Sequence, residues 1–236
     1  MQRARRLAFV AVLAVLAGFA FAGCRAEPGV AAYIGDVKIS ESRVEELVQD
    51  ARQAAEADHE AALAAAVATG VLVPPREMAP KRDQVVATLV LTEIFRRLVA
   101  ERHLQPIPVD SAKVALADNI APSSTYLPVR VEMHSYYFAL IDDVQPVEPT
   151  QAELREAYDR ARVLSAQDTF EQVAQVLSAS RVYQVAVSLR RAIADAVTRY
   201  RVVISPRYRP LESPVLELNG VGLVVLELSA NADGQR

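Results

Sequence analysis

Helical periodicity is the feature of this sequence that most constrains its fold. From Arg82 to His103, apolar residues cover so much of a helical surface that the segment should be a centrally buried helix. These residues are Val85, Val86, Leu89, Val90, Ile94, Phe95, Leu98 and Val99. The last helical segment has the clearest period and should bury one face, formed by Val182, Val185, Ala186, Leu189, Ile193, Ala196, Val197 and Tyr200. We therefore expect a helical body built around the first of these segments.

Capping residues and prolines delimit a long first helix. Ser42 and Glu45 form a capping box, and the helix should run to about Ala68 and end at Gly70. The Pro74–Pro80 segment that follows is expected to be a loop, because proline cannot continue a helix.

The middle of the chain contains further helix starts. Asp110 begins a short helix, and Pro122–Pro128 should form a second loop before a helix over Met133–Ile141. Two later helix starts have the capping-box pattern, and their residue pairs are Thr150 with Glu153 and Asp168 with Glu171.

The two ends of the chain have the residue pattern of β-structure. Near the N-terminus, Val30–Ile39 predicts a tight hairpin whose Gly35–Asp36 turn places glycine first, as a type II′ turn requires. Near the C-terminus, Arg201–Ser205 is a strand candidate, and Val215–Leu228 should form a hairpin around Asn219–Gly220. The predicted fold class is therefore mainly α with a small β-sheet (α+β).

The first 23 residues have the pattern of a secretory signal. Three arginines among the first six residues precede an apolar run over Leu7–Ala22, which spans roughly 24 Å and is shorter than the ~30 Å hydrocarbon core. Phe21–Cys24 resembles a lipobox, in which the cysteine sulfur receives a diacylglycerol. Ala20–Ala22 also fits the small-x-small site of the ordinary signal peptidase, which would leave Cys24 unmodified. We favour lipidation of Cys24, because secreted proteins rarely keep one unpaired exposed thiol.

Cys24 is the only cysteine, so the mature domain has no internal disulfide and must be held together by burial alone. Roughly 210 residues are enough for one domain with a real core. Without the three arginines of the signal, 23 basic residues face 29 acidic ones, and the formal charge is −6. Because nucleic-acid binding depends on a basic surface that displaces counterions, this balance disfavours nucleic acid as a partner.

Three segments, in the expected order, resemble one family of proteins. Val30–Ser40 (VAAYIGDVKIS), followed by an acidic amphipathic helix, resembles the opening of the SurA N-terminal domain of extracytoplasmic chaperones and foldases. Pro149–Tyr158 (PTQAELREAY) is similar to that family's T-x-x-E-L-R-x-x-Y helix. Arg201–Tyr208 (RVVISPRY) looks like the V-x-V-N-P-R-Y strand and turn of its actinobacterial lipoprotein branch, with Ser205 where asparagine is usual.

The resemblance implies a chaperone core in which the first and last strands pair around a helical body. The chain then divides into a lipoprotein signal peptide (1–23), a tether (24–29), a SurA N-terminal-like chaperone domain (30–210) and a C-terminal β-hairpin and tail (211–236). The resemblance also implies an extracytoplasmic protein that binds unfolded or exported polypeptides without ATP. It would be anchored to the cell membrane by lipid on Cys24, or secreted as a soluble protein if Cys24 is not modified.

Many members of this family carry a parvulin-type prolyl isomerase domain, so a degenerate peptidyl-prolyl isomerase is the alternative function. The Val131–His134 segment resembles a parvulin's opening strand, and Thr169–Ala174 resembles its F-x-x-x-A helix. A parvulin also needs several glycine turns and two further strands, but no glycine occurs between Val71 and Asn219. We therefore expect no isomerase activity and no catalytic residues.

Other chemistry lacks a sequence signal. His59, His103 and His134 have no ligand spacing to one another or to the cysteine, so no metal site is expected. His59 and His103 lie among charged residues and should be solvated, whereas His134 could be partly buried. No Gly-rich phosphate loop, nucleophile elbow or Ser-x-x-Lys motif occurs, and we expect no cofactor.

Met133, Tyr136, Tyr137 and Phe138 are the candidate polypeptide-binding residues. They place aromatic and soft side chains on more than one helical face, which is more than a single core-facing stripe absorbs. Aromatic side chains give large contact area at low entropic cost, and methionine adapts to varied partners. Three interpretations stay open: core packing, a surface for nonnative polypeptide, or contact with one dedicated partner of an interaction or scaffold lipoprotein.

Overall fold

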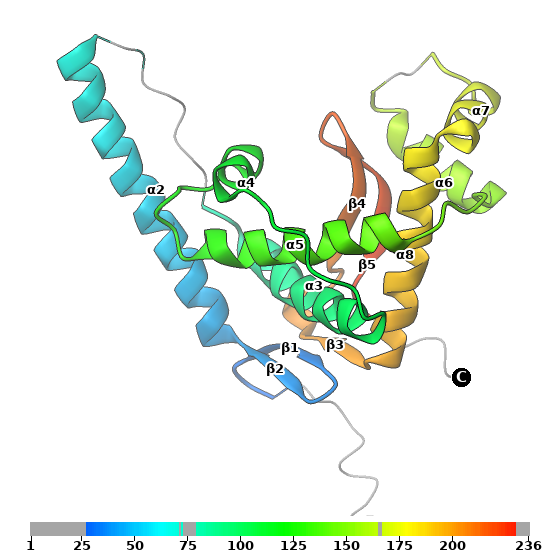
Figure 1. The fold of residues 1–236 in the computed structure, drawn as a ribbon, viewed down its shortest axis with the longest axis horizontal. Coiled ribbons are helices and arrows are strands. Elements are labelled where there is room, and N and C mark those ends of the chain that lie inside the picture. The colour runs from blue at the N-terminus through cyan, green and yellow to red at the C-terminus, as the bar shows by residue number, and fades with distance from the viewer. Residues whose placement is uncertain (1–26, 71, 73–78, 165–166, 230–236) are drawn as a thin grey trace, which may run out of the picture.

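The computed structural model describes residues 27–70, 72, 79–164 and 167–229 (Figure 1). The expected signal segment and Cys24 lie outside these ranges, as do most of the Pro74–Pro80 loop and the tail from residue 230. Helices dominate the described part and small antiparallel sheets complete it, which confirms the predicted fold class. The elements are β1 (Val30–Ile34), β2 (Val37–Ser40), α2 (Glu41–Thr69), α3 (Arg82–Glu101), α4 (Ser111–Asp118), α5 (Tyr126–Asp143), α6 (Gln151–Ala161), α7 (Phe170–Ala179), α8 (Arg181–Arg199), β3 (Val202–Ile204), the 3-10 turn η1 (Pro206–Tyr208), β4 (Glu212–Leu218) and β5 (Val221–Glu227).

Strands from distant parts of the chain form one antiparallel sheet, in the order β2-β1-β3. Tyr33 of β1 lies opposite Val203 of β3, so the predicted pairing of the first and last segments is confirmed. Gly35 has φ of 62°, the positive value expected for the first residue of the hairpin turn. Arg97 of α3 fixes this turn, because its Nη2 donates to the Ile34 carbonyl oxygen at 3.1 Å.

Helix α3 lies at the centre of the fold, as its sequence predicts. It contacts β1, α2, α5 and α8 (Figure 1). Each fully buried large apolar side chain contributes roughly 1.5–3 kcal/mol of transfer free energy, so this helix is a main source of stability. Leu89 is only partly buried, and the buried residues of α3 are Val85, Val86, Ala87, Thr88, Val90, Leu91, Thr92, Ile94, Phe95, Leu98 and Val99.

The start of α2 differs from the prediction by two residues. Ser40, not Ser42, is the N-cap, and its Oγ accepts a hydrogen bond from the Arg43 amide at 3.2 Å. Ser40 is the last residue of β2 and keeps an extended backbone, which is the conformation that an N-cap needs. The hairpin therefore leads directly into the helix, which ends at Gly70 as predicted.

The two later capping boxes have different outcomes. The box of α6, formed by Thr150 and Glu153, is confirmed. Helix α7 is capped by Thr169 and Gln172, one residue after the predicted Asp168 pair. Threonine and glutamine serve in such a box as well as aspartate and glutamate, so composition alone does not distinguish the two registers.

Helix α5 begins at Tyr126, so the predicted Pro122–Pro128 loop is too long and the predicted helix start at Met133 is wrong. Pro128 lies in the first turn, where its missing N–H costs no helical hydrogen bond. The start of α5 is fixed by Asp50 of α2, whose Oδ2 accepts from the Thr125 amide at 2.7 Å. The local sequence does not reveal this contact, because the two residues are 75 positions apart.

Helix α8 buries most of the face that its period predicts. Val182 is the exception, because it is 65% exposed in the first turn of the helix. Tyr183 takes the buried position instead, and its hydroxyl donates to the Glu153 carbonyl oxygen of α6 at 2.9 Å. Ser180 is the single residue between α7 and α8, so the chain has no strand at this point.

The β4–β5 hairpin packs against the helical body. Its turn has positive φ at both Asn219 and Gly220, which confirms the prediction from this dipeptide. Leu226 and Leu228 belong to the same core cluster as α3, and Val224 belongs to a second cluster with α6 and α8. The hairpin thus shares its core with the segment before it.

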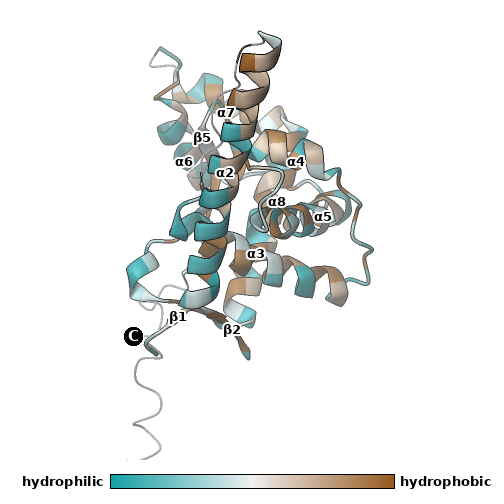
Figure 2. Ribbon diagram, turned by 90° about the vertical axis from the view of Figure 1, so that its left-hand side faces the viewer, coloured by the Kyte–Doolittle hydropathy of each residue, from teal (hydrophilic) through white to brown (hydrophobic). Residues whose placement is uncertain are grey.

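Two helical arms diverge from the sheet (Figure 1). The first is α2, whose buried residues all lie in its first half, whereas Val67 near its end is 88% exposed. Its last nine residues, Ala61–Thr69, carry no charged side chain and are mostly pale to brown in Figure 2. The second arm is formed by α6, α7 and the start of α8, with Val176 exposed. Within the described ranges, no helix combines the length and apolar character needed to cross a membrane.

Candidate functional site

A groove lies between α3, α5 and the β4–β5 hairpin, with a volume of about 900 Å³. Residues from the start of α3 and from the chain just before it complete one side. The strand β4 and the residues leading into it complete the other side. The apolar lining comes from several elements and includes Leu91, Phe95, Met133, Tyr137, Ile193 and Leu226.

The four candidate polypeptide-binding residues do not all lie in the same site. Met133 and Tyr137 line the groove, because residues four positions apart lie on one face of a helix. Tyr136 lies outside the lining and donates to Glu132 Oε1 at 3.2 Å. Phe138 is 40% exposed and lies on a third face. The prediction that these side chains occupy more than one helical face agrees with the structure, but only Met133 and Tyr137 belong to this site.

Tyr137 connects the two sides of the groove. Its hydroxyl donates to the Val215 carbonyl oxygen of β4 at 3.1 Å, and its ring lies 6.0 Å from that of Phe95. Burial raises the pKa of Tyr137, so the hydroxyl stays protonated and keeps donating at neutral pH. This hydrogen bond therefore links the hairpin to α5 across the groove.

One wall of the groove carries a compact polar cluster. Asp118, at the end of α4, accepts from Arg130 Nε at 2.7 Å and lies 3.1 Å from His134 Nε2. Arg130 Nη1 donates to Thr88 Oγ1 at 3.3 Å, and Thr88 Oγ1 lies 2.7 Å from the Tyr126 hydroxyl. Arg130 and His134 are one helical turn apart on α5, which places both beside Asp118.

The charges of this cluster balance each other. Burial raises the pKa of Asp118, but the hydrogen bonds from His134 and Arg130 outweigh it and hold the pKa at about 2. The carboxylate is therefore ionised at neutral pH and neutralises the adjacent guanidinium. Because the Arg130 guanidinium is already paired with Asp118, it does not form an open anion-binding site on this wall.

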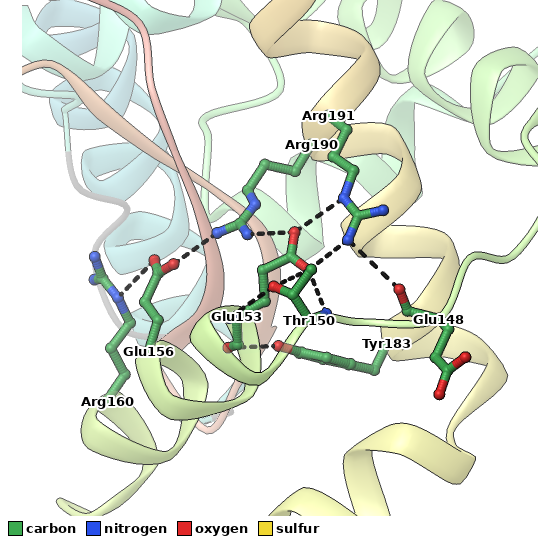
Figure 3. A network of polar contacts seen from close by, with 8 residues as sticks. All are labelled: Glu148, Thr150, Glu153, Glu156, Arg160, Tyr183, Arg190 and Arg191. Atoms are coloured by element: carbon green, nitrogen blue, oxygen red, sulfur yellow. Dashed lines mark hydrogen bonds and ion pairs between the residues drawn. The ribbon is translucent and has the colours of Figure 1, made fainter.

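A second polar network connects α6 to α8 and contributes no residue to the groove (Figure 3). Glu153 Oε1 accepts from Arg190 Nη2 at 2.9 Å and from Arg191 Nε at 3.0 Å. Glu156 accepts from Arg190 Nη1 at 2.8 Å. Burial raises the pKa of Glu153, but hydrogen bonds from Arg191, the Thr150 cap and Arg190 lower it by a larger amount, so the pKa is about 2. The network fixes the second arm to the body.

Sequence reasoning missed most of the groove. Arg130 and His134 are one helical turn apart, but Asp118 lies 12 and 16 positions before them, so the cluster has no local motif, and His134 stood out only as an isolated histidine. Thr88 lies among apolar residues of the central helix, and a hydroxyl at such a position could have indicated a buried polar contact. The contribution of β4 depends on how the hairpin packs, which its own sequence does not specify.

Metal ligation has no support in the part of the chain that the structure describes, where no group of three or more His, Cys, Asp or Glu side chains could hold an ion. His59 is partly buried and His103 is exposed. Comparison of the chain with protein-family models, with curated proteins and with solved structures finds no match.

Acid should destabilise the fold between about pH 4.5 and about pH 2. The pKa values of Glu153 and Asp118 are about 2 in the folded chain and 4.5 and 3.8 ordinarily, so the unfolded chain binds more protons in this window. Their stabilisation is complete above this window and is lost as pH falls through it, at about 2 kcal/mol for Asp118 and about 3 kcal/mol for Glu153. Urea unfolding at about pH 6, 4 and 2.5 measures the decline. Glu153→Gln should reduce it, and an unchanged decline in that variant contradicts the assignment.

Proposed function

We propose that this chain is an extracytoplasmic, lipid-anchored, ATP-independent chaperone-like protein that holds exported nonnative polypeptides near the membrane. The observation that carries the proposal is the groove of about 900 Å³ with its apolar floor and balanced polar wall. Its volume is at the upper end of the roughly 300–1,000 Å³ range of small-ligand sites. The order of SurA-like segments behind a signal-like N-terminus supplies the cellular context.

The lining suits ligands of varied sequence. Met133 and Phe95 offer adaptable and flat apolar contacts. The charged lining residues are of both signs, Lys81 and Arg130 against Asp83, Asp118 and Glu212, and Asp118 is paired with Arg130, so no strong single-sign field selects among ligands. Binding by such a surface depends on apolar area and hydrogen bonds, so it needs no nucleotide.

A substitution that fills the groove should weaken chaperone activity. Ser213 of β4 lies opposite Leu226 of β5, and both residues line the groove. Ser213→Trp should place an indole in the space that the client occupies. We expect this variant to need about tenfold more protein to suppress aggregation of a chemically denatured globular protein, which corresponds to 1.4 kcal/mol of binding free energy. Light scattering after dilution of the client measures this.

The matched control is Glu217→Trp. Glu217 is an exposed residue of the same strand outside the groove, so the control adds the same side chain without filling the site. It should suppress aggregation as well as the unsubstituted mature chain. If the mature chain at stoichiometric excess does not suppress aggregation, the chaperone proposal is wrong. Capture of one stoichiometric protein instead of a client mixture would indicate a dedicated partner, and prolyl isomerisation above the uncatalysed rate would indicate an enzyme.

Lipid attachment at Cys24 is a separate part of the proposal. The intact mass of protein extracted from membranes should equal that of a chain starting at Cys24 plus a diacylglycerol and any further acyl chain. The Cys24→Ala variant should lose this mass and leave the membrane fraction. A mass that begins at Gly23 without lipid would show cleavage by the ordinary signal peptidase and contradict the anchor.

A further inference from the structure

The strand β4 has one edge that faces away from β5. The Leu228 amide donates to the Leu211 carbonyl oxygen at 2.8 Å, so these two opposite residues form a hydrogen-bonded pair. Hydrogen-bonded and non-hydrogen-bonded pairs alternate along an antiparallel ladder. Glu212 and Pro214, which lie opposite Glu227 and Val225, therefore occupy non-hydrogen-bonded positions. Their backbone groups point away from β5.

This outer edge of β4 borders the groove. Glu212 and Pro214 both contribute to the groove lining. The Tyr137 hydroxyl reaches the next carbonyl along, that of Val215, from across the groove. In the described part of the chain β4 pairs only with β5, so the edge has no strand beside it. It presents the N–H and C=O of Glu212 and the C=O of Pro214, which has no N–H to offer.

We propose that an extended segment of nonnative polypeptide binds in the groove as an added strand on the outer edge of β4. This inference rests on the proposed chaperone function and specifies its binding mode. Backbone groups of one strand edge repeat at about twice the 3.3 Å rise per residue, and an extended polypeptide matches this repeat whatever its sequence. The pairing also satisfies polar backbone that a purely apolar groove would leave without partners.

The two faces of the hairpin also indicate which residue pattern the bound polypeptide segment should have. Side chains of an added strand alternate between the two faces of the sheet. Leu226, on the face that it shares with Ser213, packs in the core cluster with Phe95 and Met133, whereas Glu212 and Pro214 on the opposite face are exposed. The ligand is therefore an extended segment in which apolar and polar residues alternate, which is the pattern of a half-buried strand before it has paired.

Backbone methylation of a probe peptide tests the inference. The probe is a fluorescein-labelled nine-residue peptide in which valine and threonine alternate between terminal lysines, and it is titrated against the mature chain. In an added strand, alternate N–H groups point to β4 and the others point to solvent. N-methylation at one set of positions should weaken binding by about tenfold, and at the alternate set by less than about twofold. Equal effects at both sets would overturn strand addition.

The outcomes separate this inference from the chaperone proposal. Suppression of aggregation that depends on Ser213, together with probe binding insensitive to the methylated position or with no probe binding, overturns strand addition alone. If the mature chain neither suppresses aggregation nor binds the probe, both proposals are wrong.

Two proline variants supply a second measurement on the protein itself. Glu212→Pro removes an outward N–H beside the groove. Glu217→Pro removes an equivalent outward N–H outside it, because the Leu218–Val221 pair next to the two-residue turn is the hydrogen-bonded one. Only the first variant should weaken binding of the probe, by about tenfold. Equal loss in both variants contradicts the inference, and matching far-UV circular dichroism confirms that each variant is folded.

Discussion

Replacing Leu228 by alanine should lower the free energy of unfolding of the whole domain by about 3 kcal/mol. Leu228 follows β5 near the end of the described chain, yet its side chain is 0% exposed and belongs to the core that α3 organises. Removing it leaves a cavity among groups that are fixed by the sheet and the helices, so little relaxation is expected. Urea unfolding followed by far-UV circular dichroism, which reports mainly on the helices, measures the loss.

The matched control for this prediction is Leu218→Ala in the same hairpin. Leu218 is 51% exposed beside the turn, and its truncation should change the free energy of unfolding by no more than about 0.5 kcal/mol. If Leu228→Ala leaves the midpoint of helix unfolding unchanged, or produces a separate early transition, the hairpin unfolds as an independent unit. The conclusion that the hairpin shares its core with α3 is then wrong.

Local signals in the sequence predicted the elements well. The periodicity of Arg82–His103 identified the central helix, and Asn219–Gly220 identified the second hairpin. The pairing of β1 with β3 was expected from β-patterns at distant positions together with the resemblance to the SurA family. Period and turn chemistry act over a few residues, so they are visible in a single sequence.

Long-range contacts account for what the sequence did not predict. Helix α5 begins early because Asp50 of α2 accepts from the Thr125 amide, a contact that the local sequence does not reveal, and because the Ser124 hydroxyl accepts from the Tyr126 amide, a local signal that the prediction did not use. Val182 fits the period of α8, but no other element covers it, and its side chain is 65% exposed. Periodicity predicts which face of a helix is apolar, but only the packed neighbours decide how far along the helix that face is buried.

The groove shows the same limit. Met133 and Tyr137 were selected because the sequence concentrates soft and aromatic side chains around them, and both line the groove. The same criterion also selected Tyr136 and Phe138, which lie on other faces of α5 and outside the groove. The opposite wall comes from the hairpin and the polar cluster joins α3, α4 and α5, so both exist only after folding.

Removing the charge of Glu153 should destabilise the domain by about 3 kcal/mol. Glu153→Gln leaves Arg190 and Arg191 near an uncharged side chain in a site where the Glu153 carboxylate is mostly buried. Helices α6 and α7 should then separate more readily from α8. Thermal and urea unfolding measure the loss, and faster proteolysis within α6 and α7 should accompany it, because these helices depend on the network for their attachment.

The choice of glutamine isolates the charge from the cap. Glutamine serves as well as glutamate at the third position of a capping box, so the bond back to the Thr150 amide, 2.8 Å long in this structure, can persist in the variant. Glu156→Gln is the matched control, because Glu156 also pairs with Arg190 but is 37% exposed, and surface pairs contribute about 1 kcal/mol or less. If both variants cost the same small amount, the network behaves as a solvated surface pair. In that case apolar packing under Leu154 and Tyr183, rather than charge, holds the second arm in place.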